Sequence, residues 1–203
     1  MAFEKWFQQT KNIMPVIVIN DIAQAVPLAK ALIAGGIHCL EITLRTPQGI
    51  EAIKAISEQV PEAIVGAGTI TSSDQVKAVK EAGGQFIISP GISHDLCQTA
   101  QELKVPYAPG VMTPSDILIG LSYGISIFKF YPANLSGGVD MLKAFSGPFN
   151  NIKFCPTGGI TEKNAAQYLA LDNVIAVGGS WVCPSNLIKE GNWSGIQALA
   201  QAV

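Results

Sequence analysis

The feature that most constrains the fold of this chain is a regular alternation of short apolar runs with helix-like segments. Each run is rich in β-branched and aromatic residues, which is typical of buried strands. The expected strands are Met14–Ile19, Cys39–Leu44, Ala63–Ala67, Gln85–Ser89, Tyr107–Pro109, Ile125–Phe130, Ile152–Cys155 and Val174–Val177. Eight strand–helix units in 203 residues average about 25 residues each, which predicts one (β/α)8 barrel domain over residues 1–203.

Capping residues support this division of the chain. Side-chain oxygens that can cap a helix, in places followed by proline, stand at the start of six expected helices. These starts are Asn20-Asp21, Thr46-Pro47, Ser72-Ser73-Asp74, Ser93-His94-Asp95, Thr113-Pro114-Ser115-Asp116 and Thr161-Glu162-Lys163. Gly35-Gly36 and Gly83-Gly84 are expected to end helices in the left-handed conformation. A doubly wound sheet is the alternative, although no G-x-G-x-x-G follows the first strand.

The composition narrows the class of partner. Hydrophobic residues make up 48% and charged residues 14% of the chain, which suits a large core and a subunit interface. The net charge of −2 and the lack of a Lys/Arg cluster argue against nucleic acid. The N-terminal ten residues show no signal-peptide pattern, and residues 13–19 are too short to cross a bilayer. We therefore expect a cytoplasmic protein whose partners are small molecules and copies of itself.

Cysteine and histidine usage gives no sign of a metal site. The cysteines stand singly without C-x-x-C spacing, and are expected to be buried, reduced thiols; they are Cys39, Cys97, Cys155 and Cys183. His38 and His94 are the two histidines, and neither belongs to a recognisable ligand set. We expect neither a metal nor another cofactor.

A lysine, Lys129, stands within the apolar strand sequence Gly124–Pro132. A lysine ammonium has an ordinary pKa near 10.4, so the nucleophilic amine is scarce at pH 7, but burial can lower such a pKa by about 3–5 units. A buried lysine amine is the usual nucleophile for forming a Schiff base with a carbonyl. A structural lysine paired with a buried carboxylate is the other interpretation, and the strand alone leaves both open.

The second expected strand carries charge on one face. Because side chains alternate along a strand, Glu41, Thr43 and Arg45 share one face, while three leucine or isoleucine side chains share the other. The apolar face must lie under the helices, so Glu41 and Arg45 are expected to point into the barrel. They stand about 13 Å apart along the strand, with Arg45 at the C-terminal rim. A structural ion pair between Glu41 and Lys129 is the alternative to a catalytic role.

Small residues follow several strands at the same rim. The sequences Gly158-Gly159 and Gly178-Gly179-Ser180 follow the seventh and eighth strands, where barrels use close backbone approach to bind phosphate. They predict a phosphorylated substrate, although paired glycines also form simple tight turns. Thr69 and the sequence Ser89-Pro90-Gly91 lie after strands three and four. The Thr69 hydroxyl can donate to a carboxylate, and a turn-forming role is the alternative for both segments.

Six stretches in barrel order resemble the bacterial 2-keto-3-deoxy-6-phosphogluconate (KDPG) aldolase family, whose activity overlaps with that of 4-hydroxy-2-oxoglutarate aldolase. These stretches are Leu40–Thr46, Val65–Thr69, Ile88–Gly91, Phe128–Ala133, Cys155–Ile160 and Gly178–Trp181. The resemblance covers nearly the whole chain. It implies a class I aldolase of the Entner–Doudoroff pathway that needs no cofactor, assembles as a homotrimer and forms pyruvate and glyceraldehyde 3-phosphate.

The resemblance also implies roles for individual residues. Lys129 is expected to form the Schiff base and Glu41 to transfer protons. The implied substrate-binding residues are Arg45, Thr69, Pro90, Tyr131, Thr157, Gly158, Gly159, Gly179 and Ser180. Arg45 and Thr69 would hold the pyruvate carboxylate, and the glycines with Ser180 the phosphate. Tyr131 departs from the family pattern, which more often has phenylalanine, and this leaves the substrate preference open.

Two rival functions fit the same residues. A sugar-phosphate isomerase or epimerase would use Glu41 to shuttle protons and Lys129 only for its charge. A non-catalytic sensor would bind a phosphorylated metabolite without forming product. Covalent attachment of a keto acid on reduction separates the aldolase from both, because it requires an imine.

Overall fold

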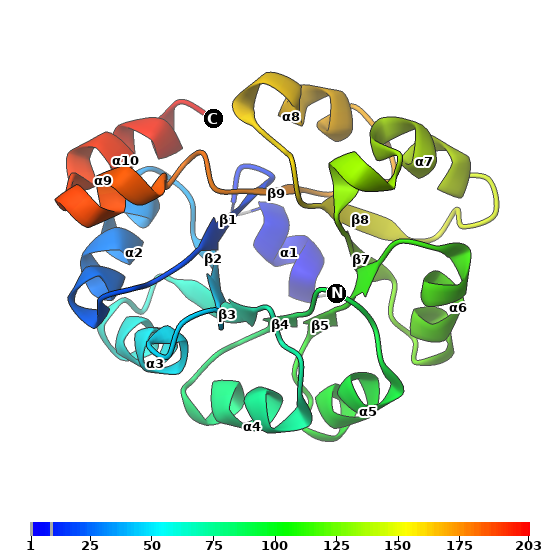
Figure 1. Ribbon diagram of the computed structural model, residues 1–203, viewed down its shortest axis with the longest axis horizontal. Helices are drawn as coiled ribbons and strands as arrows, with labels where there is room; N and C mark the ends of the chain where they lie inside the picture. Colours follow the sequence, from blue (N-terminus) through cyan, green and yellow to red (C-terminus); the bar gives the residue numbers. More distant parts are fainter. Residues whose placement is uncertain (1, 9) are drawn as a thin grey trace.

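In the computed structural model, which describes residues 2–8 and 10–203, parallel strands curl around a central axis inside a ring of helices (Figure 1). The strands are β1 (Ile13–Ile17), β2 (Cys39–Thr43), β3 (Ile64–Gly68), β4 (Ile87–Ile88), β5 (Tyr107–Ala108), β6 (Gly110–Val111), β7 (Ile127–Phe130), β8 (Lys153–Pro156) and β9 (Val177–Gly179). The predicted barrel class is confirmed.

The surrounding helices complete the strand–helix alternation. The α-helices are α1 (Ala2–Gln8), α2 (Ala25–Ala34), α3 (Gly49–Gln59), α4 (Ser73–Glu81), α5 (His94–Glu102), α6 (Pro114–Ser122), α7 (Gly138–Phe145), α8 (Glu162–Leu169), α9 (Ser185–Glu190) and α10 (Trp193–Gln201). Two 3₁₀ turns, η1 (Ile22–Gln24) and η2 (Ala133–Ser136), follow β1 and β7. Among the described residues, no helix has the length and apolar character needed to cross a membrane.

The nine strands of the described residues occupy eight barrel positions. One sheet has the order β5-β4-β3-β2-β1-β9 and the other β6-β7-β8. Parallel bridges between Phe154 and Val174 and between Thr157 and Gly178 connect β8 with the β9 segment. Only Pro109 separates β5 from β6, and proline has no backbone N–H to continue a ladder. The fifth expected strand is therefore interrupted and extends to Val111.

Several predicted boundaries are wrong by a few residues. The eighth strand was expected at Val174–Val177, but β9 runs from Val177 to Gly179, because Val174 makes only a single bridge before the chain pairs with β1. The helix start expected at Thr46-Pro47 falls at Gly49, since the Thr46 hydroxyl donates instead to the Ile19 carbonyl.

Other helix boundaries follow the predicted signals. Ser72, Ser93 and Thr113 each cap the first turn of a helix through the side-chain oxygen. Gly36 and Gly83 adopt the expected left-handed conformation, with φ of +90° and +83°.

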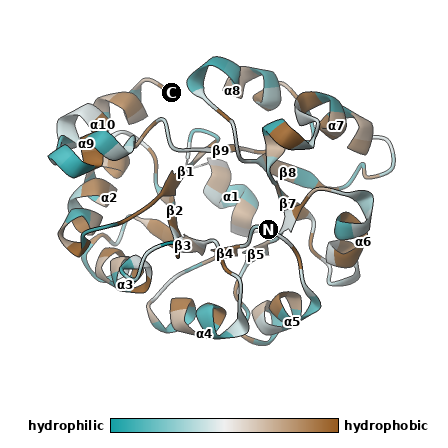
Figure 2. Ribbon diagram, viewed as in Figure 1, coloured by the Kyte–Doolittle hydropathy of each residue, from teal (hydrophilic) through white to brown (hydrophobic). Residues whose placement is uncertain are grey.

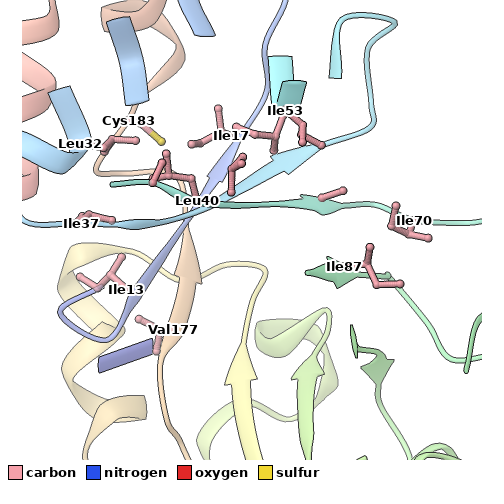
Figure 3. Packing of buried hydrophobic residues seen from close by; sticks show 14 of the residues in the cluster. Ile13, Ile17, Leu32, Ile37, Leu40, Ile53, Ile70, Ile87, Val177 and Cys183 are labelled. Carbon is pink, nitrogen blue, oxygen red and sulfur yellow. The ribbon is translucent and has the colours of Figure 1, made fainter. Parts of the chain in front are cut away.

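The apolar residues form an outer core between strands and helices and an inner core along the barrel axis. In the outer core, Ile17, Leu32 and Leu40 pack together from β1, α2 and β2 (Figure 3). Phe128 and Phe130 also belong to this outer core, as their alternation with Lys129 predicts. Figure 2 shows hydrophobic and hydrophilic residues on each surrounding helix, as expected for helices with one face on the strands.

The first helix lies in the centre of the ring of strands when the barrel is viewed along its axis (Figure 1). The Phe3 ring stacks on Phe7 and packs edge-on against Phe86, with ring centroids 5.6 Å apart in both cases. These rings join Met14 and Ile127 in the inner core. Sequence analysis missed this helix, although Phe3, Trp6 and Phe7 have the spacing of one helical face.

Candidate active site

Two charged side chains meet inside the barrel. Lys129 on β7 and Glu41 on β2 point inward, and Lys129 Nζ donates to Glu41 Oε1 over 3.1 Å. The lysine side chain is 4% exposed and the glutamate side chain 1% exposed. Removing two opposite charges from water is costly unless they are paired in good geometry. The observed pair fits both a catalytic amine beside its base and a structural ion pair.

Two thiols lie beside this pair on the same inward faces. Cys155 on β8 is in register with Lys129, and Cys39 precedes Glu41 by two residues on β2. Burial, and after it the nearby Glu41 carboxylate, raises the pKa of Cys155 to about 12, while Lys129 opposes the shift. Burial also raises the pKa of Cys39. Both thiols are therefore protonated at neutral pH, and all four cysteines are buried and free, as predicted.

Arg45 and Thr69 meet at the rim. Arg45 is exposed, and its Nε donates to Thr69 Oγ1 over 3.1 Å. Thr69 has φ of +62°, a left-handed conformation that costs a β-branched residue about 1–2 kcal/mol. Between Glu41 and Arg45, the Thr43 hydroxyl donates to the Ile17 carbonyl over 2.8 Å. The structure thus places Glu41 deep and Arg45 at the mouth, in the predicted order.

A cavity of about 390 Å³ opens at this end of the barrel. It contains seven of the nine predicted substrate-binding residues, namely Arg45, Tyr131, Thr157, Gly158, Gly159, Gly179 and Ser180. Thr69 is not among the lining residues, but it accepts a hydrogen bond from Arg45, which is. Pro90 is exposed and is not part of its lining. Gly178, which the sequence analysis named with Gly179, also lines the cavity, and the remaining lining residues were missed: Val16, Val18, Ile160, Cys183, Ser185 and Ile188. Val16 and Val18 could have been found, since they alternate with the outward-facing residues of β1.

Tyr131 connects the cavity with the charged pair. It follows Lys129 by two residues on the same face of the chain, and the centroid of its ring lies 5.3 Å from Lys129 Nζ. An ammonium within about 6 Å of an aromatic centroid is attracted by the negative ring face. The ring also lines the cavity, whereas Lys129 and Glu41 are not among the lining residues. Tyr131 therefore contacts both the open cavity and the buried amine.

Glycines form one part of the cavity wall. Gly158 and Gly159 have φ of +99° and +77°, so glycine is the residue that this turn favours. A Cβ atom on Gly179 would collide with the Trp181 ring. Gly178 and Gly179 were expected to follow the eighth strand, but they belong to β9 itself. Backbone brought this close to a cavity can approach an anion directly.

The histidines lie in other environments. His38 Nδ1 is 3.3 Å from the Glu62 carbonyl, and His94 Nδ1 is 2.9 Å from the Tyr123 hydroxyl. Within residues 2–8 and 10–203, no group of three or more His, Cys, Asp and Glu side chains is arranged to hold a metal ion.

Comparisons with known proteins agree on one family. The sequence profile of KDPG and KHG aldolase matches residues 5–199. The chain is 51% identical to 2-dehydro-3-deoxy-phosphogluconate aldolase of Dickeya dadantii over 93% of this chain and 89% of that protein. It is 48% identical to KHG/KDPG aldolase of Escherichia coli over 95% of this chain and 90% of that protein.

Solved structures give the same result. The crystal structure of KDPG aldolase from Legionella pneumophila, with pyruvate captured at low pH as a covalent carbinolamine intermediate, has a TM-score of 0.96 and 47% identity, covering 98% of this chain and 97% of that one. The Zymomonas mobilis KDPG aldolase with 3-phosphoglycerate has a TM-score of 0.91 and 43% identity, covering 99% and 94%. The chain belongs to the KDPG and KHG aldolase family.

Proposed function

We propose that this protein is a class I aldolase that cleaves 2-keto-3-deoxy-6-phosphogluconate to pyruvate and glyceraldehyde 3-phosphate, and that residues 1–203 form one catalytic domain. The buried contact between Lys129 and Glu41 carries the proposal. It places an amine and a proton acceptor within one hydrogen bond of each other. A relative that holds pyruvate as a carbinolamine supports covalent chemistry in this family.

The first half of the reaction uses the amine. Neutral Lys129 Nζ adds to the C2 ketone to form a carbinolamine, which loses water to give a protonated imine. The positive nitrogen then withdraws electrons from the C3–C4 bond. The face of the Tyr131 ring, 5.3 Å from this nitrogen, stabilises positive charge there.

The second half uses the carboxylate. Glu41 accepts the proton of the C4 hydroxyl, and the C3–C4 bonding electrons move into the imine to form an enamine. The C4 fragment leaves as glyceraldehyde 3-phosphate. The proton returns to C3, and water hydrolyses the resulting imine to release pyruvate and the free lysine amine. One carboxylate therefore acts first as base and then as acid.

The remaining polar groups are assigned to the two charged ends of the substrate. Arg45, held by Thr69, binds the keto-acid carboxylate, because a guanidinium recognises carboxylates through charge-assisted hydrogen bonds. Gly158, Gly159, Gly179 and Ser180 bind the phosphate at the wall that they form. Thr157 and Pro90 complete the proposed contacts with the substrate.

A second substrate, 4-hydroxy-2-oxoglutarate, is supported by the names of two relatives. The Escherichia coli relative is a KHG/KDPG aldolase, and a structure with a TM-score of 0.85 and 37% identity is a 4-hydroxy-2-oxoglutarate aldolase/2-deydro-3-deoxyphosphogluconate aldolase. This keto acid offers the same C2 ketone and C4 hydroxyl to Lys129 and Glu41. It carries a carboxylate where the sugar acid continues toward its phosphate.

We also propose that the protein is a cytoplasmic homotrimer. Five large apolar side chains are exposed on β6–α6, η2 and α7, namely Met112, Leu118, Leu121, Leu135 and Met141. Leu135 is 84% exposed, and apolar groups of this kind are typical of interfaces. Light scattering that gives the mass of one chain for the wild type would contradict the trimer. Leu135→Glu is expected to weaken it.

The function is tested by following both products of one turnover. The protein is mixed with the phosphorylated keto acid, and pyruvate and glyceraldehyde 3-phosphate are measured separately. Equal amounts of both are expected. Glu41→Gln should slow their release about 10²–10⁴-fold. An isomerised keto acid of unchanged mass, without either product, would favour the isomerase.

A further inference from the structure

One strand of the barrel leaves its inward positions empty. Along β3, Ile64 packs on the inner core, but the next two inward positions are Gly66 and Gly68. A Cβ atom on Gly66 would lie 2.5 Å from Cγ of Phe86. A Cβ atom on Gly68 would lie 2.7 Å from both Cγ and Cδ of Glu41, and closer still to Oε1. Side chains from other strands therefore fill the space that β3 leaves open.

The register shows which way the glutamate leans. Glu41 pairs with Gly66, and Thr43 pairs with Gly68. The Glu41 carboxylate nevertheless lies against Gly68, two residues nearer the C-terminal ends of the strands. The side chain thus leans along the strand toward the mouth of the barrel. Its Oε1 atom, the atom closest to the Gly68 position, is the one that accepts the hydrogen bond from Lys129.

We propose that Gly68 is a positioning residue for proton transfer: its lack of a side chain admits the Glu41 carboxylate to the place where its Oε1 atom meets Lys129 and from which it can reach the substrate. This inference rests on the proposed function. Gly68 does not have a positive φ, so alanine fits the backbone there, and Gly68→Ala tests the added methyl group alone.

The experiment measures the reaction of the Lys129 amine and proton transfer by the Glu41 carboxylate separately. Incubation with pyruvate and sodium borohydride measures imine formation at Lys129 as the trapped fraction. Loss of the pyruvate methyl protons in D₂O, followed by NMR, measures proton transfer by Glu41. In Gly68→Ala we expect a trapped fraction within about twofold of wild type and proton exchange slowed about 10–100-fold, since a displacement near 1 Å can cost about 10²-fold. Such a split is not expected from general destabilisation.

A matched control and a second substitution complete the test. Gly147→Ala adds the same methyl group after α7, where the nearest atom is the Ala144 carbonyl oxygen at 3.7 Å, and should change neither readout. Glu41→Asp shortens the carboxylate side chain. It should slow exchange strongly in the wild type and much less in the Gly68→Ala background, because the methyl group has already displaced the longer side chain.

Three results would overturn the inference. The first is unchanged exchange in Gly68→Ala, and the second is an equal loss of exchange and trapping. The third applies if Gly68→Ala does not fold: the double variant Gly68→Ala/Glu41→Asp should then recover folding, and an unfolded double variant would show that Glu41 does not occupy this space. A wild-type protein without adduct or exchange would instead overturn the proposed function itself.

Discussion

The two ends of the barrel interior are built from the same strands, but one stabilises the fold and the other carries the charged residues of the site. At the end that α1 covers, Phe7, Phe86 and Ile127 pack as an apolar core. Two residues farther along β7 from Ile127, Lys129 forms a buried ion pair with Glu41. A single step along the inward face thus separates a residue that stabilises the fold from one suited to chemistry. This barrel therefore places stability and reactivity in successive layers, as the general division between the two faces of such barrels predicts.

The largest effect is expected when the amine is removed from the reactive layer. Lys129→Met keeps a long side chain but removes the amine, and it should lower aldol cleavage by at least about 10⁴-fold because no imine can form. A coupled assay for pyruvate measures this. Lys153→Met on the neighbouring strand is the control, because Lys153 Nζ donates to the Asp172 carbonyl on an exposed side. Cleavage by Lys129→Met at the wild-type rate would exclude Schiff-base chemistry at this residue.

The converse change removes an aromatic ring from the apolar layer. Phe7 has no exposed surface, and Phe7→Ala should lower the free energy of unfolding by about 3–5 kcal/mol, through lost burial and the cavity left behind. Urea denaturation measures the loss. Below the unfolding transition, kcat should stay within about twofold of wild type. A fall in kcat with little change in stability would mean that α1 shapes the active site directly.

A change at the rim should act on binding. Arg45→Ala removes a charge-assisted partner of the substrate carboxylate, worth about 1.5–3 kcal/mol, and should raise KM about 10–100-fold with a smaller change in kcat. Steady-state kinetics over a range of keto-acid concentrations measure both constants. An unchanged KM would remove Arg45 from the carboxylate site and leave it a partner of Thr69 only.

The smallest expected effect concerns Tyr131, which lines the cavity and lies near Lys129. Tyr131→Phe keeps the aromatic face near Lys129, whereas Tyr131→Leu removes it, and a desolvated cation–π contact is worth about 0.5–2 kcal/mol. The leucine variant should therefore need about 2–30-fold more pyruvate than the phenylalanine variant for the same trapped imine. Equal requirements would show that the ring does not stabilise the cation.

The periodicity of the sequence predicts much of this architecture. Alternation along residues 38–45 places Glu41 and Arg45 on the inward face, and the spacing of Lys129 and Tyr131 places both on one face of β7. The strand order then brings the two faces together. The sequence offers an ion pair between Glu41 and Lys129 only as one alternative, because the two residues are 88 apart in the chain, and the structure shows their contact at 3.1 Å.

The errors have identifiable causes. Val174 and Ile175 have strand-forming side chains, but the regular ladder with β1 begins at Val177. Paired glycines predict a phosphate-binding loop after the eighth strand, yet Gly178 and Gly179 lie in β9 itself, where a side chain on Gly178 would collide with Thr157. The sequence did not indicate the role proposed for Gly68, because a glycine has no side chain and its importance depends on which neighbours fill the space.

The central claim is that Lys129 acts as a covalent nucleophile. We would incubate the wild-type protein with pyruvate and sodium borohydride, measure the intact mass and map the modified peptide. The account predicts one added pyruvate-derived group per chain, located on Lys129 and absent from Lys129→Met. A folded protein that remains unmodified, or carries the group on another lysine, would contradict it.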